Sequence, residues 1–74
     1  MEKTYYYIVY RYNRKGRRWE IFFRSVINGH YDDMMLTEFY GNKAEAINTA
    51  KNWAKYCEEV YSVNISSIMH GRAL

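Results

Sequence analysis

Residues 17–31 have the sequence RRWEIFFRSVINGHY, which is the strongest fold signal in the chain. Residues 17–26 are rich in aromatic and β-branched side chains, a composition typical of a β-strand. The Asn28-Gly29 pair that follows is the dipeptide best suited to the positive φ angles of a two-residue type I′ turn. Residues 31–40 then return as another strand, so this stretch predicts an antiparallel hairpin.

A further strand is predicted ahead of this hairpin, over residues 4–12, with a polar turn at residues 13–16 that ends in Gly16. Side chains alternate between the two faces of a strand, and residues directly opposite each other share a face. Pairing Tyr12 with Arg17 and Ile27 with His30 across the two turns predicts one apolar face, made of Tyr6, Ile8, Tyr10, Trp19, Ile21, Phe23, Met34 and Leu36. The two turns independently predict the same core.

A helix is predicted from Lys43, because Asn42 is a good N-cap and Glu45 completes a capping-box spacing. Its apolar residues recur at helical spacing and are Ala46, Ile47, Ala50, Trp53, Ala54, Cys57 and Val60. Residues 61–69 alternate again and predict a last strand with Val63 and Ile65 inward, beside either the first or the third strand. The predicted fold is α+β: a three-stranded antiparallel meander, one helix on one face and a fourth C-terminal strand, in the order β-β-β-α-β.

Length and composition predict a single domain over residues 1–74, with an ordered core at about residues 4–69. Hydrophobic residues make up 49% of the 74-residue chain and aromatic residues 19%, enough for one core but not for two. A single cysteine and no visible signal peptide or membrane-spanning run lead us to expect a cytoplasmic protein. The net charge of +3 excludes a DNA mimic and leaves acidic proteins and nucleic acids open as partners.

Catalysis has no candidate residues, so we expect no enzyme activity, no cofactor and no metal. Cys57 falls on the apolar stripe of the predicted helix, whereas a nucleophilic cysteine needs partial exposure and a lowered pKa. His30, Asp32 and Asp33 cluster after the second turn, but no further His or Cys lies at metal-ligand spacing. No Gly-rich phosphate loop or nucleophile elbow is present.

The strand alternation turns a second set of side chains onto the sheet face opposite the helix, which no predicted element covers. In the predicted register, Tyr7 lies opposite Phe22, and Arg18 lies opposite both Arg11 and Phe39. Apolar side chains at the centre and charges at the rim are typical of protein interfaces. The candidate binding residues are Tyr5, Tyr7, Arg11, Arg18, Phe22, Arg24, Met35 and Phe39.

Three hypotheses compete for this face: a solvated sheet surface, a protein-binding patch and a nucleic-acid-binding surface. Exposed Tyr, Phe, Met and Arg are typical of interface hot spots, whereas nucleic acids favour aromatic stacking with Arg and Lys on phosphates. We favour a protein or ribonucleoprotein partner because Glu20 and Asp33 lie within the face and would repel phosphates. A homodimer through the sheet face or a sheet edge is also open. Arg14, Lys15 and Arg17 form a secondary basic turn, which is a further candidate binding site.

Two resemblances follow from these segments. Residues 14–19 and residues 37–46 resemble the arm-binding domain of tyrosine integrases, which implies DNA binding through the sheet. The predicted last strand is a departure from that family's pattern. The order of the elements and the size of the chain are similar to small phage-encoded inhibitors of host machinery, including anti-CRISPR proteins and RNA-polymerase inhibitors. That similarity rests on architecture alone and implies a protein-binding inhibitor without assigning any residue.

Overall fold

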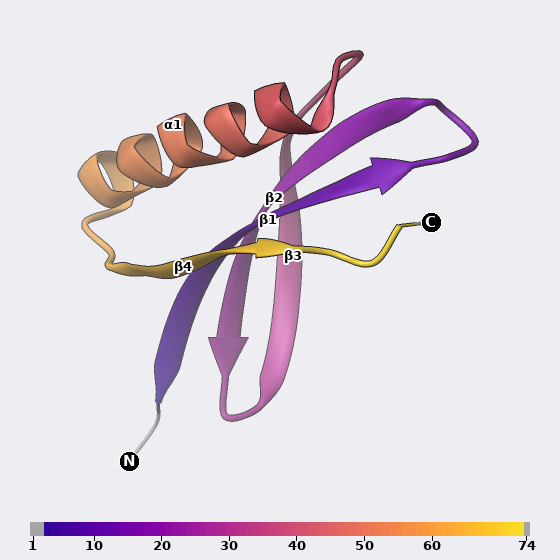
Figure 1. Cartoon of the computed structure of the whole chain (residues 1–74). Coiled ribbons are helices and arrows are strands. Elements are labelled where there is room, and N and C mark those ends of the chain that lie inside the picture. The colour runs from indigo at the N-terminus through magenta and orange to yellow at the C-terminus, as the bar shows by residue number, and fades with distance from the viewer. Residues whose placement is uncertain (1–2, 74) are drawn as a thin grey trace.

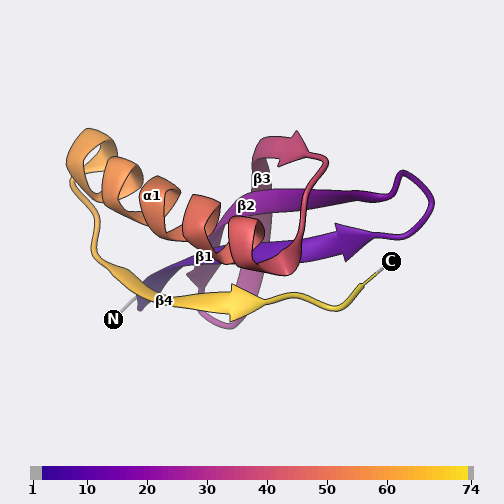
Figure 2. The ribbon, with the colours of Figure 1, turned by 45° about the horizontal axis from the view of Figure 1, so that its top comes forward.

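The computed structural model describes residues 3–73 as four strands and one helix, shown in Figure 1. The helix lies across one face of a single sheet with strand order β3-β2-β1-β4 (Figures 1 and 2). This arrangement confirms the predicted α+β fold and its element order. The elements are β1 (Thr4–Asn13), β2 (Arg18–Ile27), β3 (His30–Phe39), α1 (Lys43–Tyr61) and β4 (Ile65–His70).

The β1–β2 turn differs from its prediction, because β1 and β2 pair two residues out of the expected register. Tyr12 lies opposite Trp19, and Asn13 is the last paired residue of β1, opposite Arg18. The Asn13 side chain fixes the turn, since its Oδ1 accepts a hydrogen bond from the Gly16 amide at 3.2 Å. A slip of two residues leaves every side chain on its predicted face, because the period of a strand is two.

The β2–β3 turn confirms its prediction and then meets an irregularity. Ile27 pairs with His30 across Asn28-Gly29, both of which have positive φ. Further along, the pairing skips one residue of β3, at Leu36. Phe39 therefore lies opposite Trp19 and packs against the core under α1, so its predicted place on the opposite face is wrong.

Helix α1 begins as predicted, with a complete capping box between Asn42 and Glu45. The residues of α1 that are fully buried against the sheet are small: Ala46, Ala50 and Cys57. Small side chains let the helix axis approach the sheet closely, so the bulky strand residues beneath fill the space between the layers. The apolar stripe is shorter than predicted, because Val60 near the C-terminal end is exposed.

Strand β4 lies beside β1 and runs parallel to it, which decides the position that the sequence left open. It is shorter than predicted, because α1 continues to Tyr61 and Ser62 then adopts a left-handed conformation. A register shift between Tyr6 and Tyr7 of β1 places Ile65 and Ile68 of β4 against the core, in place of the predicted pair Val63 and Ile65.

The core lies between α1 and the central strands. Ile8 and Ile21 are fully enclosed there, and Trp19 is buried beside them with its Nε1 donating to the Gly41 carbonyl at 3.2 Å. Trp53 of α1 is half-buried against the same cluster. No helix within residues 3–73 is long and apolar enough to cross a membrane.

Candidate binding surface

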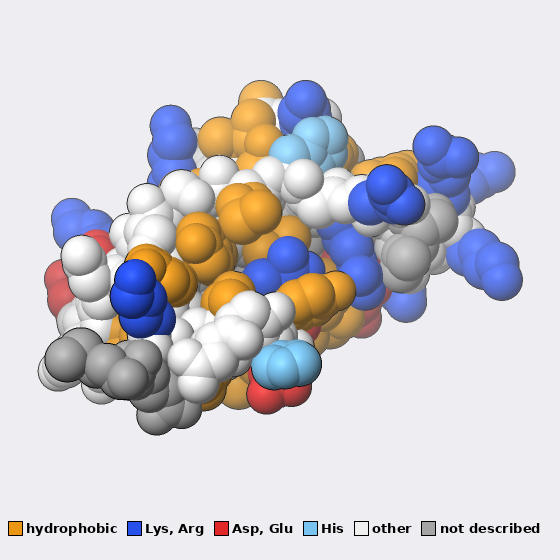
Figure 3. All heavy atoms as spheres, turned by 90° about the horizontal axis from the view of Figure 1, so that it is seen from below, with side chains coloured by type: hydrophobic (Ala, Val, Ile, Leu, Met, Phe, Trp, Pro, Cys, Tyr) orange, Lys and Arg blue, Asp and Glu red, His pale blue; other side chains and the backbone are white. Residues whose placement is uncertain are grey.

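We call the sheet face opposite α1 the open face; Figure 3 views the molecule from that side and shows hydrophobic side chains with Lys and Arg between them. The strand pairings arrange this face in rows that run across the sheet. Apolar rows alternate with charged rows, so each apolar row borders a charged one. The apolar rows are Tyr31-Val26-Tyr5 and Met35-Phe22-Val9-Met69; the charged rows are Asp33-Arg24-Tyr7 and Glu38-Glu20-Arg11.

Phe22 lies in the middle of this face but is buried, with only 7% of its surface exposed. The Arg11 guanidinium covers it, with its carbon 4.4 Å from the centre of the phenyl ring. Val9, next to Phe22 in the same row, is also buried, and it lies close to Gly71 beyond the end of β4. The prediction that Phe22 is an exposed contact residue is therefore wrong, because a neighbouring side chain covers it.

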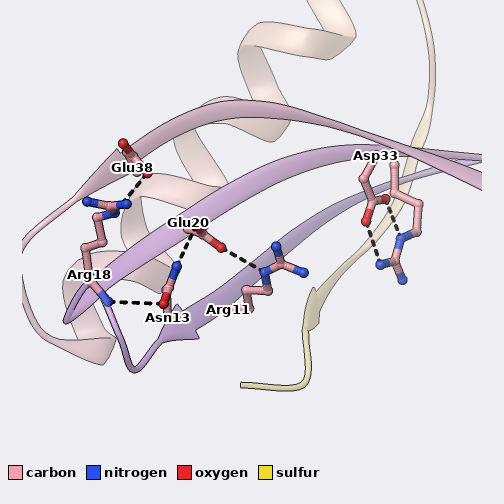
Figure 4. Close-up of polar contacts among 8 residues, drawn as sticks. Arg11, Asn13, Arg18, Glu20, Asp33 and Glu38 are labelled. Atoms are coloured by element: carbon pink, nitrogen blue, oxygen red, sulfur yellow. Dashed lines mark hydrogen bonds and ion pairs between the residues drawn. The ribbon is translucent and has the colours of Figure 1, made fainter. Parts of the chain in front are cut away.

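A buried carboxylate holds Arg11 in that position. Glu20 is 4% exposed, and its two oxygens accept hydrogen bonds from Arg11 Nε at 2.9 Å and Asn13 Nδ2 at 3.2 Å. Figure 4 shows both side chains pointing towards Glu20. Since Asn13 also accepts from the Gly16 amide, Glu20 links the open face to the β1–β2 turn.

The pKa of Glu20 reflects two opposing effects. Burial disfavours the charged carboxylate and raises the pKa, but hydrogen bonds from Arg11 and Asn13 and the charges of Arg11 and Arg18 lower it. The lowering effects win, so the pKa of Glu20 lies below the ordinary value of 4.5. The group is charged at neutral pH despite its burial.

Arg24 and Asp33 form the second ionic contact of the open face. Two nitrogens of Arg24 donate to the two carboxylate oxygens of Asp33, at 2.7 and 2.9 Å. The same guanidinium lies 4.2 Å from the centre of the Tyr31 ring. The hydrogen bond to Asp33 raises the pKa of Arg24. This arginine is thus fixed between a carboxylate and an aromatic ring, and the predicted pairing of Arg24 with Asp33 is confirmed.

Arg18 makes the third contact, at the edge of the face nearest the β1–β2 turn. Its Nε lies 3.0 Å from Glu38 Oε2 without hydrogen-bond geometry, so the contact is an ion pair only. Arg18 faces Asn13 across the strands, which corrects the predicted pairing with Arg11. All three predicted arginines of the site are therefore paired with acids of the same face.

The side chains that remain open to a partner are mostly apolar. Tyr31 is 61% exposed, and Tyr5 and Met35 are exposed. The half-buried Tyr7 lies in the row between the row of Tyr5 and Tyr31 and the row of Met35. The sequence missed Tyr31, although it has the same alternation as Asp33 and Met35. It also missed the exposed Met69, because only the place of β4 beside β1 brings it to this face.

The basic turn Arg14, Lys15 and Arg17 projects from one end of the sheet and is exposed as predicted. Among residues 3–73, none of these three side chains forms an ion pair. Arg17 has a positive φ of 51°, which is uncommon for a residue with a side chain. The turn therefore carries three exposed cations that no acidic side chain within residues 3–73 neutralises.

The groups considered for catalysis are not brought together. Cys57 is fully buried, and burial raises the pKa of its thiol, which makes it a poor nucleophile at neutral pH. Within residues 3–73, no three His, Cys, Asp or Glu side chains form a group that could hold a metal ion. A shallow hollow of about 220 Å³ on α1 is lined by Asn52, Trp53 and Tyr56 and contains no acid-base pair.

Comparison of the chain with protein-family models, with curated proteins and with solved structures found no match.

Proposed function

We propose that this chain is a non-enzymatic binding protein whose open face binds a partner protein or ribonucleoprotein. The observation that carries the proposal is the pairing of arginines with acids on a face that still exposes Tyr5, Tyr31 and Met35. Exposed Tyr beside fixed arginines gives a partner large apolar contacts at a low cost in side-chain entropy, and the flexible exposed Met adds apolar area that can adapt to the partner. The contact region shifts from the predicted Phe22 towards the end of the sheet that carries Tyr31 and Tyr5.

The ion pairs favour a protein partner over a nucleic acid. An arginine already bonded to a carboxylate releases few counterions on meeting a phosphate, so it adds little to nucleic-acid affinity. Arg11 and Arg24 are both held in this way, and each lies over an aromatic ring. They act as rigid, flat parts of the surface, as arginines at protein interfaces commonly do.

A second candidate function is binding of DNA or RNA through the basic turn. The observation in its favour is that Arg14, Lys15 and Arg17 are exposed together, without ion pairs among the described residues. In a complex with an acidic protein, the same cations would speed association by electrostatic steering.

The resemblance to small phage-encoded inhibitors supports a role in inhibiting or modulating the partner, in the cytoplasm of a host cell.

The experiment combines partner capture with surface variants. The purified chain is used to capture partners from host lysate, beside a variant with Tyr5→Ala, Tyr31→Ala and Met35→Ala and a control with Lys51→Ala and Lys55→Ala on α1. We expect the triple variant to lose a captured protein that the wild type and the control retain. Loss in the control with retention in the triple variant would place the site on α1 and contradict the proposal.

Titration with random-sequence DNA and RNA at increasing salt separates the two candidate functions. Binding through several phosphates weakens steeply as salt rises, because released counterions drive it. We expect weak binding with a shallow salt dependence. Sub-micromolar, salt-sensitive binding that disappears in the Arg14→Ala, Lys15→Ala, Arg17→Ala variant would establish the second candidate instead.

A further inference from the structure

We propose that the outer edge of β3 receives an extended segment of the partner protein as a fifth strand, and that this segment carries Lys or Arg opposite Asp32. The inference rests on the proposed function, since it states how the same partner is held. Addition of a strand to a sheet edge supplies main-chain hydrogen bonds for affinity, while side chains on alternate positions supply specificity.

The first observation is the free edge itself. β3 pairs with β2 on one side and lies at the end of the strand order, so nothing in the described chain pairs with its other side. In an antiparallel sheet, alternate residues of an edge strand direct both backbone groups outward. Residues 30–35 keep regular pairing with β2, and the irregularity comes only after them, at Leu36. This segment is long enough for a partner strand of ordinary length.

The second observation concerns the side chains on either side of this edge. Tyr31 and Met35 are exposed on the open face, and Met34 is exposed on the face that α1 covers elsewhere. α1 packs mainly on β1, β2 and β4, so it leaves the outer part of β3 uncovered. A strand added at this edge would bury apolar side chains on both faces of the sheet. The edge is continuous with the open face through Tyr31 and Met35.

The third observation is charge. β3 contains Asp32, Asp33 and Glu38 and neither Lys nor Arg. Arg24 and Arg18 pair with Asp33 and Glu38, whereas Asp32 is exposed and forms no ion pair within residues 3–73. A second copy of the chain would bring two such acidic strands together, and like charges on paired strands destabilise a sheet. A cationic residue opposite Asp32 makes a favourable cross-strand pair, so a basic partner segment fits this edge better than a second copy.

The other sheet edge offers less. β4 is shorter, its pairing with β1 is irregular between Tyr6 and Tyr7, and its only charged or titratable side chain is His70. His70 stacks on Tyr10 with ring centres 4.9 Å apart, so it is already engaged. Length, regular pairing and an unpaired carboxylate therefore distinguish β3.

The test selects ligands from a displayed library of random twelve-residue peptides on the full chain and maps the bound peptides by amide hydrogen exchange. We expect enriched peptides with Lys or Arg among β-branched residues, and slowed exchange at amides of residues 30–35. Asp32→Lys should weaken these peptides roughly three- to tenfold, because an attractive cross-strand pair becomes repulsive. Glu59→Lys, the same charge change on the exposed side of α1, is the matched control and should leave them unchanged.

Other outcomes overturn the inference. Three results would contradict strand addition: peptides that protect other amides, a library without binders, or equal effects of Asp32→Lys and Glu59→Lys. The acidic residues of β3 would then only prevent this edge from pairing with other strands. A concentration-dependent dimer with protected β3 amides would identify a second copy as the occupant. If a captured partner is lost with the Tyr5, Tyr31 and Met35 variant but binds the Asp32→Lys variant with the same affinity as the wild type, the proposed function stands and the strand addition fails.

Discussion

The two faces of the sheet bury their apolar residues in different ways. Under α1, Ile21 is enclosed by neighbouring strand residues and by a helix whose inner residues are small. On the open face, Phe22 is nearly as well buried, but its cover is the Arg11 side chain, which Glu20 holds in place. Adjacent residues of one strand thus reach similar burial, one through a second layer of structure and the other through an ion pair.

Because of this difference, the stability of the molecule should depend on charge mainly on the open face. Burial under a helix is set by apolar area and packing, neither of which changes with pH or salt over ordinary ranges. Arg11 is bonded to Glu20, so we expect the cover of Phe22 to depend on the protonation state of that carboxylate.

The largest effect is expected for Ile21→Ala. Removing this fully enclosed side chain leaves a cavity between sheet and helix and should lower the free energy of unfolding by about 2 to 5 kcal/mol, enough to unfold a small domain. Urea denaturation followed by circular dichroism measures it. Ile27→Ala, at an exposed position of the same strand, is the control and should change stability by no more than about 0.5 kcal/mol.

Arg11→Met should have the next largest effect, because Phe22 loses the guanidinium that covers it and Glu20 loses a charged partner. The expected cost is about 1 to 3 kcal/mol, the usual penalty for a buried polar group left without its hydrogen bond. Adding Glu20→Gln should recover part of that loss, since the neutral amide tolerates burial better. If the loss of unfolding free energy in the double variant equals the sum of the losses in the two single variants, Glu20 and Arg11 do not act as a pair.

The dependence of the unfolding free energy on pH in the acidic range tests the contribution of Glu20 to stability. Because its pKa is lower in the folded chain than in the unfolded one, its contribution is fully present above the ordinary value of 4.5 and is lost as pH falls through the folded pKa. Glu20→Gln should therefore flatten the pH dependence of stability in that acidic range. An unchanged profile in this variant would show that Glu20 carries no such contribution.

Asp33→Asn should change stability by only about 1 kcal/mol, because the pair with Arg24 is partly exposed. Its informative consequence concerns binding. Release of Arg24 adds an uncompensated cation to the open face, so affinity for random-sequence DNA should rise and its salt dependence should steepen. If DNA affinity stays unchanged, the ion pairs are not what keeps this face from binding nucleic acid.

The smallest effect is expected for Lys51→Ala and Lys55→Ala on the exposed side of α1. Both side chains are exposed and form no ion pair in the described part of the chain, so stability and partner binding should stay within experimental error of the wild type. Thermal unfolding and the capture assay measure the two. A marked loss of binding would move the functional surface from the sheet to the helix.

The faces of β1 and β2, the second turn and the start of α1 follow from the amino-acid sequence alone. Alternation assigns each side chain to the correct face even when the register is wrong, as long as the error in register is an even number of residues. That is why the wrong pairing of Tyr12 with Arg17 still assigned Ile8, Tyr10, Trp19 and Ile21 to one core. Asn28-Gly29 and the Asn42 capping box depend on residues close in the sequence, so local chemistry was sufficient there.

Features that depend on residues far apart in the sequence do not follow from local patterns and appear only in the folded chain. The irregularity at Leu36 turned Phe39 towards the core, and strand alternation gives no signal for an extra residue. The place of β4 beside β1 brought Met69 to the open face, and an ion pair with Glu20 laid Arg11 over Phe22. A pattern along one strand assigns a side chain to a face, but what covers that face depends on the three-dimensional positions of other side chains.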